Sequence, residues 1–330
     1  MKRTMKKMVS MALTGTMAVA VLAGAGTSEV KAADKAKIGV LVADVSGEEA
    51  QGFRSYYENY IAGNYDVEFN YTDALQSAED EKTAIEKFAS QGCQAIISFS
   101  SNDRVQQIET CEKYGVYYAV ASGVLDDAQY ETYKTYEYFA GQVGPGNDTE
   151  FEAGKDMGAY YKEQGVSKVA IYGAFIPNPM HVYRVAGVLN GLGCTYGGES
   201  DMNAIAGQIF QDQTVDLSKV EGDVEVVSYL QGYGDTTTDE LNAAIQKTPD
   251  AFISVGMATT FFAQSLSEAG ISFSDIDSFT ETNGNSMKNG TLTYLAGKYS
   301  SSIGPVFALV MNAINGNVIR DEDGNAPSIS

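Results

Sequence analysis

EAGKDMGAYYKEQGVSKVAIYG, residues 152–173, places a glycine-bearing segment with helical character directly before an apolar segment rich in β-branched residues. We predict a helix over residues 149–165 and a buried strand over residues 166–175. A helix followed at once by a buried strand is the repeating unit of proteins that have a parallel sheet. This stretch therefore predicts an α/β fold.

The same alternation continues on both sides of this stretch. Upstream, it begins with AKIGVLVAD, residues 36–44, and continues to a strand at residues 116–123. Downstream, it continues through strands at residues 224–230, 250–256 and 276–281. Such alternation predicts parallel sheets that are covered by helices on both faces. Because the Gly/Pro-rich segment GQVGPGN separates the two series, we expect two doubly wound domains.

Local signals mark the ends of several predicted helices in the first series. Asn102 is a plausible N-cap for the helix that follows it. Gly92 and Gly115 each lie just past a predicted helix end.

The N-terminal segment has the pattern of a secretory signal peptide. A basic cluster precedes an apolar run from Met8 to Gly26, and Val30-Lys31-Ala32 supplies a small-x-small cleavage site. A retained membrane helix is the alternative, but the run is rich in Ala, Gly and Thr rather than strongly apolar. A lipoprotein signal would need a cysteine at Ala25. We therefore expect residues 1–32 to be removed and the protein to be periplasmic or extracellular, without a lipid anchor.

The charge excludes several classes of partner. Removing residues 1–32 takes five basic residues and one acidic residue from totals of 22 and 43, which leaves a formal charge of −25. Nucleic-acid binding and docking to anionic membranes both depend on basic surfaces, so neither is expected. With about 300 mature residues, two domains are the natural expectation.

The three cysteines do not form a disulfide framework in a chain of this length. Cys93 and Cys111 would meet if a helix runs back along its strand, but buried free thiols are the preferred interpretation for both and for Cys194.

Several passages together resemble the type I periplasmic-binding-protein family, the sugar-binding, LacI-like solute-binding proteins of ABC transporters. The passages are EAGKDMGAYYKEQGVSKVAIYG, RVAGVLNGLG (184–193), TPDAFISVGMATTFFAQSLSEAG (248–270) and GTLTYLAGKYSSSIGPVFALVMNAINGN (290–317). The resemblance covers most of the mature chain and rests on the order and spacing of the passages. It implies two doubly wound parallel-sheet lobes, joined by a three-segment hinge and closing on a ligand.

The resemblance also implies the domain boundaries. The chain would cross between lobes near Gly141–Pro145, Lys298–Ser301 and Gly316–Ile319. Lobe 1 would comprise residues 33–141 and 299–317, and lobe 2 residues 142–298 and 318–330. The family usually ends with one further strand, but DEDGNAPSIS follows the last crossing so closely that we expect a truncated end or no such strand.

Ligands of open α/β sheets bind beyond the carboxyl ends of the strands, so residues at predicted strand ends are candidates for the site. From lobe 1 these are Asp44, Ser46, Ser100, Ser101 and Ser122, and from lobe 2 Phe175, Met257, Glu281 and Lys298. Phe53 lies on the first predicted helix, close enough to its start to face the cleft, and is a candidate for stacking on a ligand ring. By resemblance, Arg184 corresponds to a ligand-contacting arginine of sugar-binding relatives, and His181 lies beside it.

The chain departs from the sugar-binding pattern at several of these positions. Ser122-Gly123 stands where relatives have Asp-Arg, and Gly256-Met257 where they have Asn-Asp. Glu281 replaces an aspartate, and Lys298 stands in place of a glutamine. These departures put a plain aldose in doubt and leave a carboxylate-bearing or phosphorylated ligand open.

No residues suggest catalysis, a cofactor or a metal site. His181 is the single histidine, and no nucleophile lies in a G-x-S-x-G context. GQVGPGN lacks the spacing of a dinucleotide loop, and DEDGN lacks that of an EF-hand. We therefore expect a non-enzymatic, monomeric receptor without cofactor that binds a small, sugar-like ligand and delivers it to the permease of an ABC importer. A sensory receptor of the same fold and an exported α/β enzyme are the alternatives.

Overall fold

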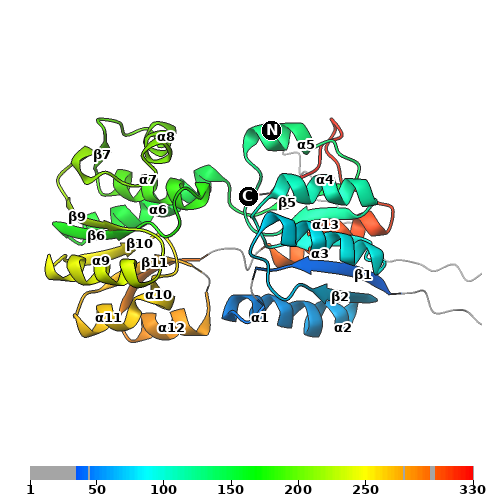
Figure 1. Ribbon diagram of the computed structural model, residues 1–330, viewed down its shortest axis with the longest axis horizontal. Coiled ribbons are helices and arrows are strands. Elements are labelled where there is room, and N and C mark those ends of the chain that lie inside the picture. Colours follow the sequence, from blue (N-terminus) through cyan, green and yellow to red (C-terminus); the bar gives the residue numbers. More distant parts are fainter. Residues whose placement is uncertain (1–34, 44, 278, 298–301, 330) are drawn as a thin grey trace, which may run out of the picture. The chain divides into compact units, whose positions relative to one another are not determined.

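The computed structural model describes residues 35–43, 45–277, 279–297 and 302–329. A six-stranded, fully parallel sheet has the order β13-β5-β4-β3-β1-β2 and forms the first lobe (Figure 1). Its strands are β1 (Ala36–Leu41), β2 (Val67–Tyr71), β3 (Ala95–Ser98), β4 (Tyr117–Val120), β5 (Phe139–Val143) and β13 (Ser328–Ile329).

Two layers of helices cover the two faces of this sheet. The first layer is α1 (Glu48–Ser55), a π-helix (Tyr56–Ile61), α2 (Ala62–Asn64) and α13 (Ile303–Ile314). The second is α3 (Ala78–Ser90), α4 (Arg104–Tyr114) and α5 (Asp127–Tyr133). Ile38 and Val40 of β1 pack with the first layer, whereas Leu41 packs with the second. This alternation follows from the period of two along a strand.

The structure confirms two of the three predicted helix-end residues and corrects the third. Gly115 is the C-cap of α4 at φ +66°, and Gly92 has φ +82° just after α3. The N-cap of α4 is Asp103 rather than Asn102, because the Asp103 carboxylate accepts a hydrogen bond from the Gln106 N–H at 2.9 Å. The Asn102 N–H is instead bonded to Glu81.

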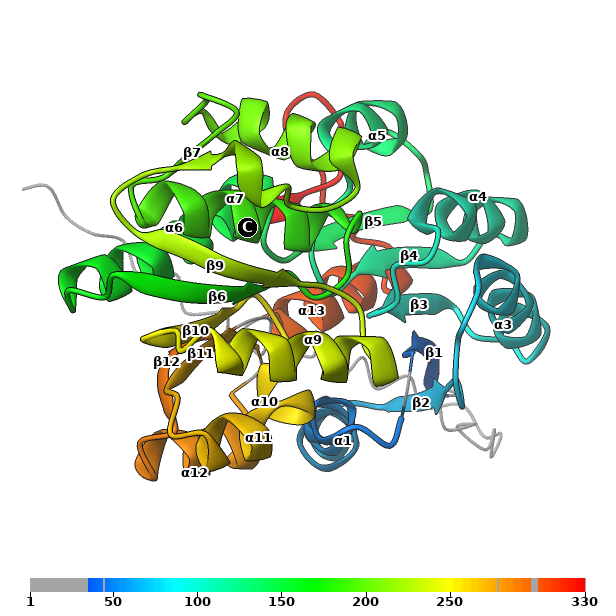
Figure 2. The same ribbon diagram turned by 60° about the vertical axis from the view of Figure 1, so that its left-hand side comes forward.

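A five-stranded parallel sheet of order β12-β11-β10-β6-β9 forms the second lobe (Figure 2). Its strands are β6 (Lys168–Tyr172), β9 (Glu225–Leu230), β10 (Ala251–Ser254), β11 (Phe273–Ile276) and β12 (Leu292–Ala296). The helices are α6 (Asn147–Glu163), α7 (Pro179–Gly191), α8 (Met202–Asp212), α9 (Asp235–Gln246), α10 (Ala258–Phe261), α11 (Ala263–Glu268) and α12 (Glu281–Lys288). A 3₁₀ turn (Leu217–Lys219) and an antiparallel pair, β7 (Thr195–Tyr196) with β8 (Val220–Glu221), lie beside them. In both views, α6 and α7 lie on one side of the sheet and α9 on the other.

Helices α6 and α7 touch through their backbones. A Cβ on Gly154 would fall on the Arg184 carbonyl, and a Cβ on Gly187 would fall on the Phe151 carbonyl. Glycine is required at these positions for the close approach, because any side chain would force the two helices apart. The glycine-bearing helix predicted from the sequence therefore has a packing function.

The chain passes from the first sheet to α6 at residues 144–146, whereas residues 141–143 of the predicted crossing belong to β5. It returns between β12 and α13, a stretch that includes the predicted crossing at 298–301, which lies outside the described residues.

The predicted third crossing and the assignment of residues 318–330 to lobe 2 are wrong, because the end of the chain pairs with β5 in the first sheet. The Pro327 and Ile329 carbonyls accept hydrogen bonds from the N–H groups of Gln142 and Gly144 at 2.9 and 2.8 Å. A further strand is therefore present, and it covers the otherwise unpaired edge of β5.

The remaining differences concern short elements. The predicted hinge segment overlaps the last three residues of β5. Helices α5 and α8, and α12 after its first residue, lie in stretches without a predicted element. The strand predicted at residues 276–281 is β11, which begins and ends earlier.

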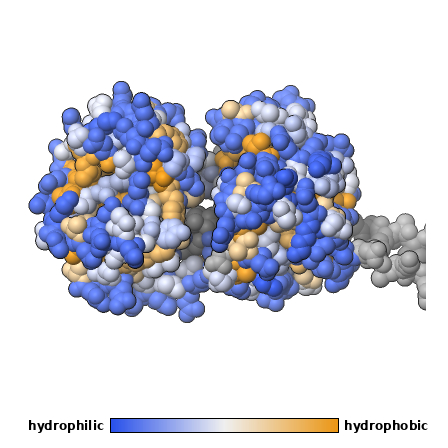
Figure 3. Space-filling model, in the orientation of Figure 1, coloured by the Kyte–Doolittle hydropathy of each residue, from blue (hydrophilic) through white to orange (hydrophobic). Residues whose placement is uncertain are grey.

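Cys93, Cys111 and Cys194 are buried free thiols, which confirms the preferred interpretation. The predicted signal peptide, residues 1–32, lies outside the described residues. Within the part of the chain that is described, every helix is too short or too polar to cross a bilayer. Hydrophilic residues dominate the face drawn in Figure 3, as the strongly acidic composition predicts.

Candidate functional site

A pocket of about 300 Å³ lies where the loops after β3 and β4 meet the N-terminal ends of α6 and α7. Its lining is mostly polar and comprises Ser101, Asn102, Asp103, Arg104, Ser122, Gly123, Val124, Asp126, Gln129, Pro145, Asn147, Glu150, Asn178, Pro179 and Met180. Two of the predicted site residues, Ser101 and Ser122, lie in this pocket. The position agrees with the rule that ligands bind beyond the carboxyl ends of parallel strands.

The loop after β3 is fixed by a buried carboxylate on α3. Glu81 is fully buried and accepts hydrogen bonds from the N–H groups of Asn102 and Asp103, each at 3.0 Å. The hydroxyl of Ser100 also donates to Glu81, so this predicted residue is 3% exposed and faces inward. The result is a rigid loop that presents Ser101 and Asn102 to the pocket.

The loop after β4 is fixed by a guanidinium. Arg104 donates from Nη1 to the Val124 carbonyl at 2.8 Å and from Nη2 to the Ser122 carbonyl. Burial lowers the pKa of Arg104. Gly123, at φ +75°, lies against this guanidinium. Two of its five N–H donors thus hold backbone carbonyls, and its buried Nε has no hydrogen-bond partner among the described residues.

Arg184 is fully buried between α6 and the second sheet. Its Nε donates to the Glu150 carboxylate, and its Nη1 donates to the Val255 carbonyl at 2.9 Å. The Ile276 carbonyl lies 3.4 Å from the same nitrogen. Arg184 therefore joins α6 to the ends of β10 and β11, and in this structure it has no exposed surface that could meet a ligand directly.

Aromatic rings gather at the carboxyl ends of β6, β9 and β10. Phe175 lies edge-on to Tyr233, whose ring stacks on Phe261 with centroids 5.8 Å apart. Tyr233 is 69% exposed and Phe261 is 37% exposed. His181 is buried behind Phe175, with Nδ1 3.2 Å from the Phe175 backbone nitrogen. Tyr233 and Phe261 offer exposed apolar faces of the kind that stack on sugar rings.

The other predicted site residues that the structure describes lie outside this pocket. Phe53 is buried and stacks on Phe99 with centroids 4.1 Å apart, so its ring belongs to the first lobe's core. Ser46 is exposed before α1, and Met257 precedes α10 with φ +69°. The N–H of Glu281 donates to Glu48 at 2.7 Å. Asp44 and Lys298 lie outside the described residues.

Sequence reasoning missed most of the polar lining. The missed residues include Asn102, Asp126, Gln129, Asn147, Glu150 and Asn178. Asn147 and Glu150 begin a helix whose start was predicted two residues too late, after a segment interpreted only as a hinge. Asn102 could have been found by the rule that residues just after a predicted strand are candidates for the site, here called the strand-end rule. Asp126 caps α5 and Gln129 lies in it, and no periodic signal for that helix was recognised in the sequence.

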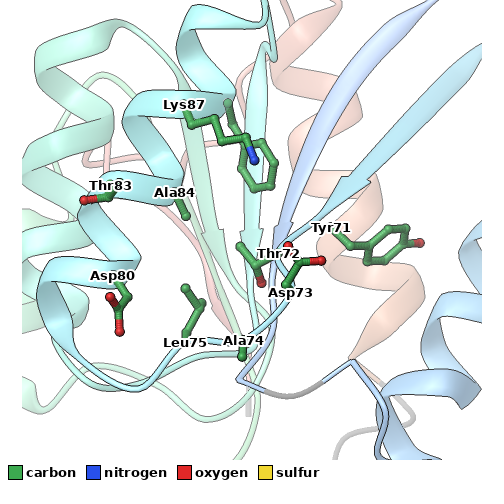
Figure 4. Close-up of a pocket in the computed structure, with 10 residues that line it drawn as sticks. Tyr71, Thr72, Asp73, Ala74, Leu75, Asp80, Thr83, Ala84 and Lys87 are labelled. Carbon is green, nitrogen blue, oxygen red and sulfur yellow. The ribbon is translucent and has the colours of Figure 1, made fainter.

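A second pocket, of about 230 Å³, lies between the end of β2 and α3 (Figure 4). Thr72 lines it, but its hydroxyl bonds to the backbone of Val42. Asp80 accepts a hydrogen bond from the Gln76 N–H, and Figure 4 shows the Tyr71 ring turned away from α3. Asp73, Thr83 and Lys87 are the other polar side chains of its lining, and the first pocket is larger and has more of them, which favours the first pocket as the functional site.

No family model matches the sequence, and no curated protein matches it. The fold has clear counterparts among solved structures. An ABC transporter periplasmic solute-binding protein from Actinobacillus succinogenes 130z, with bound D-allose, has a TM-score of 0.65 and 16% identity over 86% of this chain and 93% of that one. One from Bacillus halodurans C-125, with bound myo-inositol, has a TM-score of 0.61 and 16% identity over 88% and 92%.

The chain has the type I periplasmic-binding-protein fold. This confirms the predicted two-lobe α/β architecture. This chain is also similar to the transcription regulator CcpA of Lactococcus lactis, with a TM-score of 0.60 and 10% identity over 87% of this chain and 94% of that one. Because one fold serves several activities, the function has to be argued from the site.

Proposed function

We propose that this protein is an extracytoplasmic solute-binding receptor of an ABC importer, and that its two lobes close on a small sugar or sugar derivative. The observation that carries the proposal is the polar pocket at the carboxyl ends of β3 and β4. Its side chains supply amide, hydroxyl and carboxylate groups, which are the partners that sugar hydroxyls use. The solute-binding proteins of the same fold that hold D-allose and myo-inositol support the proposal.

The net charge of the chain favours a solute-binding receptor over a transcription regulator of the same fold. Without residues 1–32, the chain has a formal charge of −25, which opposes contact with DNA phosphates. Export through the predicted signal peptide fits a receptor that meets its ligand outside the cytoplasm. In this proposal the protein is a monomer without catalytic activity that delivers its ligand to a membrane permease. Sequencing the N-terminus of the mature protein tests the cleavage after Ala32.

A ligand screen tests the function. The purified mature chain is melted with D-allose, L-arabinose, D-galactose, myo-inositol, sugar acids, amino acids and peptides, and calorimetric titration gives the Kd of each compound that shifts the melt. A sugar or polyol is expected to raise the stability by about 2.7 kcal/mol at a concentration of 100 Kd. Shifts with amino acids or peptides alone would contradict the sugar preference. Turnover of any compound would contradict the binding-only function.

A variant tests whether the pocket is the binding site. Asn147→Ala removes an amide from the lining, and a lost neutral hydrogen bond predicts roughly three- to tenfold weaker binding. Asn289→Ala changes an asparagine just after α12, outside this pocket, and serves as the matched control. Equal Kd values for the wild type and Asn147→Ala would place the ligand elsewhere.

A further inference from the structure

We infer that Glu150 is the residue that selects the ligand in this pocket, and that it selects neutral, hydroxyl-rich compounds over acidic ones. Arg184 acts through Glu150 as a positioning residue. This inference rests on the proposed function and adds to it a specificity-determining residue and the charge of the ligand.

The first step is the placement of the Glu150 carboxylate. Glu150 is 4% exposed yet lines the pocket from the first turn of α6. Its Oε2 pairs with Nε of Arg184. Among the described residues, no hydrogen-bond partner is found for its Oε1. An almost buried carboxylate therefore has one oxygen available to a molecule in the pocket.

The second step is the rigidity of this carboxylate. Arg184 is fixed by the carbonyls of Val255 and Ile276, which end two neighbouring strands. The glycine contacts of Gly154 and Gly187 hold α6 against α7, which carry Glu150 and Arg184 respectively. The carboxylate is thus held in place before a ligand arrives, and this lowers the entropic cost of binding.

The third step is the charge of the lining. An ionised carboxylate accepts hydrogen bonds and cannot donate them, so its partner on the ligand must be a hydroxyl or another donor. Asp103 and Asp126 add two more carboxylates to the pocket. The single guanidinium in the lining, Arg104, is bonded to the Ser122 and Val124 carbonyls. A carboxylate or phosphate on the ligand would face repulsion there, whereas a sugar hydroxyl would gain a charge-assisted hydrogen bond.

The test compares neutral and acidic probes on the wild-type chain. D-allose, L-arabinose, D-galactose and myo-inositol are titrated beside D-galacturonate and D-glucuronate. At least one neutral probe is expected to bind, with each acid at least tenfold weaker. Acids that bind as tightly as the best neutral probe would overturn the inference and leave the receptor function standing. If no neutral probe binds, the inference fails together with the sugar preference of the proposed function.

Variants at position 150 then test the role of the Glu150 carboxylate separately. Glu150→Gln keeps the shape of the side chain and removes its charge. It is expected to weaken binding of the best neutral probe by roughly tenfold or more, and to reduce the factor by which the neutral probe binds more tightly than the acids. Glu152→Gln is the matched control, because Glu152 lies on the same helix and pairs only with Lys155 at the surface. A merely structural role for Glu150 would lower the melting temperature without changing that ratio.

Glu150→Gln leaves Arg184 with a weaker partner and could therefore unfold the second lobe. Glu150→Asp keeps a charged partner for Arg184 and shortens the side chain by one methylene, so it is the second variant if Glu150→Gln does not fold. It is expected to fold, to keep the preference for neutral probes and to bind them more weakly than the wild type. Binding by either folded variant within twofold of the wild type would overturn the role of Glu150.

Discussion

At the residue scale, Asp250, which stands between Pro249 and Ala251, has a clear structural role in the second lobe. The Asp250 carboxylate accepts hydrogen bonds from the N–H groups of Ser167 and Lys168, both at 2.9 Å, and from the Ser167 hydroxyl at 3.0 Å. Asp250 directly precedes β10, Ser167 directly precedes β6, and Lys168 is the first residue of β6. This carboxylate therefore ties the starts of two paired strands together.

These bonds predict a pH dependence of stability. The backbone N–H groups of Ser167 and Lys168 lower the pKa of Asp250. A lowered pKa in the folded state means that the stabilisation is fully present above the unfolded pKa, about 3.9, and is lost as the pH falls through the lower folded pKa. Asp250→Asn should therefore lower the melting temperature at pH 7, and the difference from the wild type should shrink below about pH 4.

Asp239→Asn is the control for this measurement, because Asp239 is exposed on α9. A difference between Asp250→Asn and the wild type that stays constant from pH 7 to pH 3 would mean that the Asp250 charge is not what stabilises the junction.

The residue scale is also where sequence reasoning was least complete. The strand-end rule found Ser101 and Ser122, because strand ends can be located from apolar runs. It also selected Ser100, and stacking on a ligand ring was predicted for Phe53, but both side chains have partners inside the first lobe. The rule gives the position of a residue along the chain but not the direction of its side chain, which depends on partners such as Glu81 and Phe99.

At the element scale, the contact between α6 and α7 predicts opposite effects for two glycine-to-alanine changes. Gly187→Ala places a methyl group on the Phe151 carbonyl of the neighbouring helix, so we expect a loss of about 1–3 kcal/mol or more. Gly207→Ala, on α8, meets no atom within 4 Å and should stabilise the protein by about 0.5–1 kcal/mol through helix propensity. Chemical denaturation of both variants measures the two changes. Stabilisation by Gly187→Ala would mean that the helices are not in backbone contact.

The pairing of β13 with β5 predicts a second effect at this scale. Deleting residues 324–330 removes β13 and leaves the N–H groups of Gln142 and Gly144 without their strand partners. We expect a lower melting temperature and, because the edge of β5 becomes exposed, self-association that increases with concentration. Light scattering and thermal melts test this. A deletion variant that stays monomeric and as stable as the full chain would contradict it.

Long periodic segments were predicted well from the sequence at the element scale. The central strands of both sheets are almost continuously apolar, so their buried positions follow from composition alone. Strand β13 was missed because two residues that follow a turn leave no periodic signal. Its position depends on the free edge of β5, which the sequence does not reveal.

At the scale of the whole molecule, the two lobes have separate hydrophobic cores. One core cluster draws its buried residues from Phe151 to Leu292, and the other two draw theirs from the first lobe and α13. We therefore expect calorimetry to resolve two unfolding transitions. Gly187→Ala should lower only the transition of the second lobe. A single transition with equal calorimetric and van't Hoff enthalpies, shifted as a whole by Gly187→Ala, would show that the lobes unfold as one unit.

The separate cores have a consequence for how the chain folds as it is made. The second lobe is one continuous segment, so it has all its parts before the chain is finished. The first lobe begins the described chain, but one face of its sheet is covered by residues of α13, near the end of the sequence. These residues include Ile303, Val306, Phe307 and Val310. A chain that emerges N-terminus first therefore carries an incomplete first lobe until its last thirty or so residues appear. This delay would keep the first lobe incompletely folded during synthesis, which suits the export that we propose for this chain.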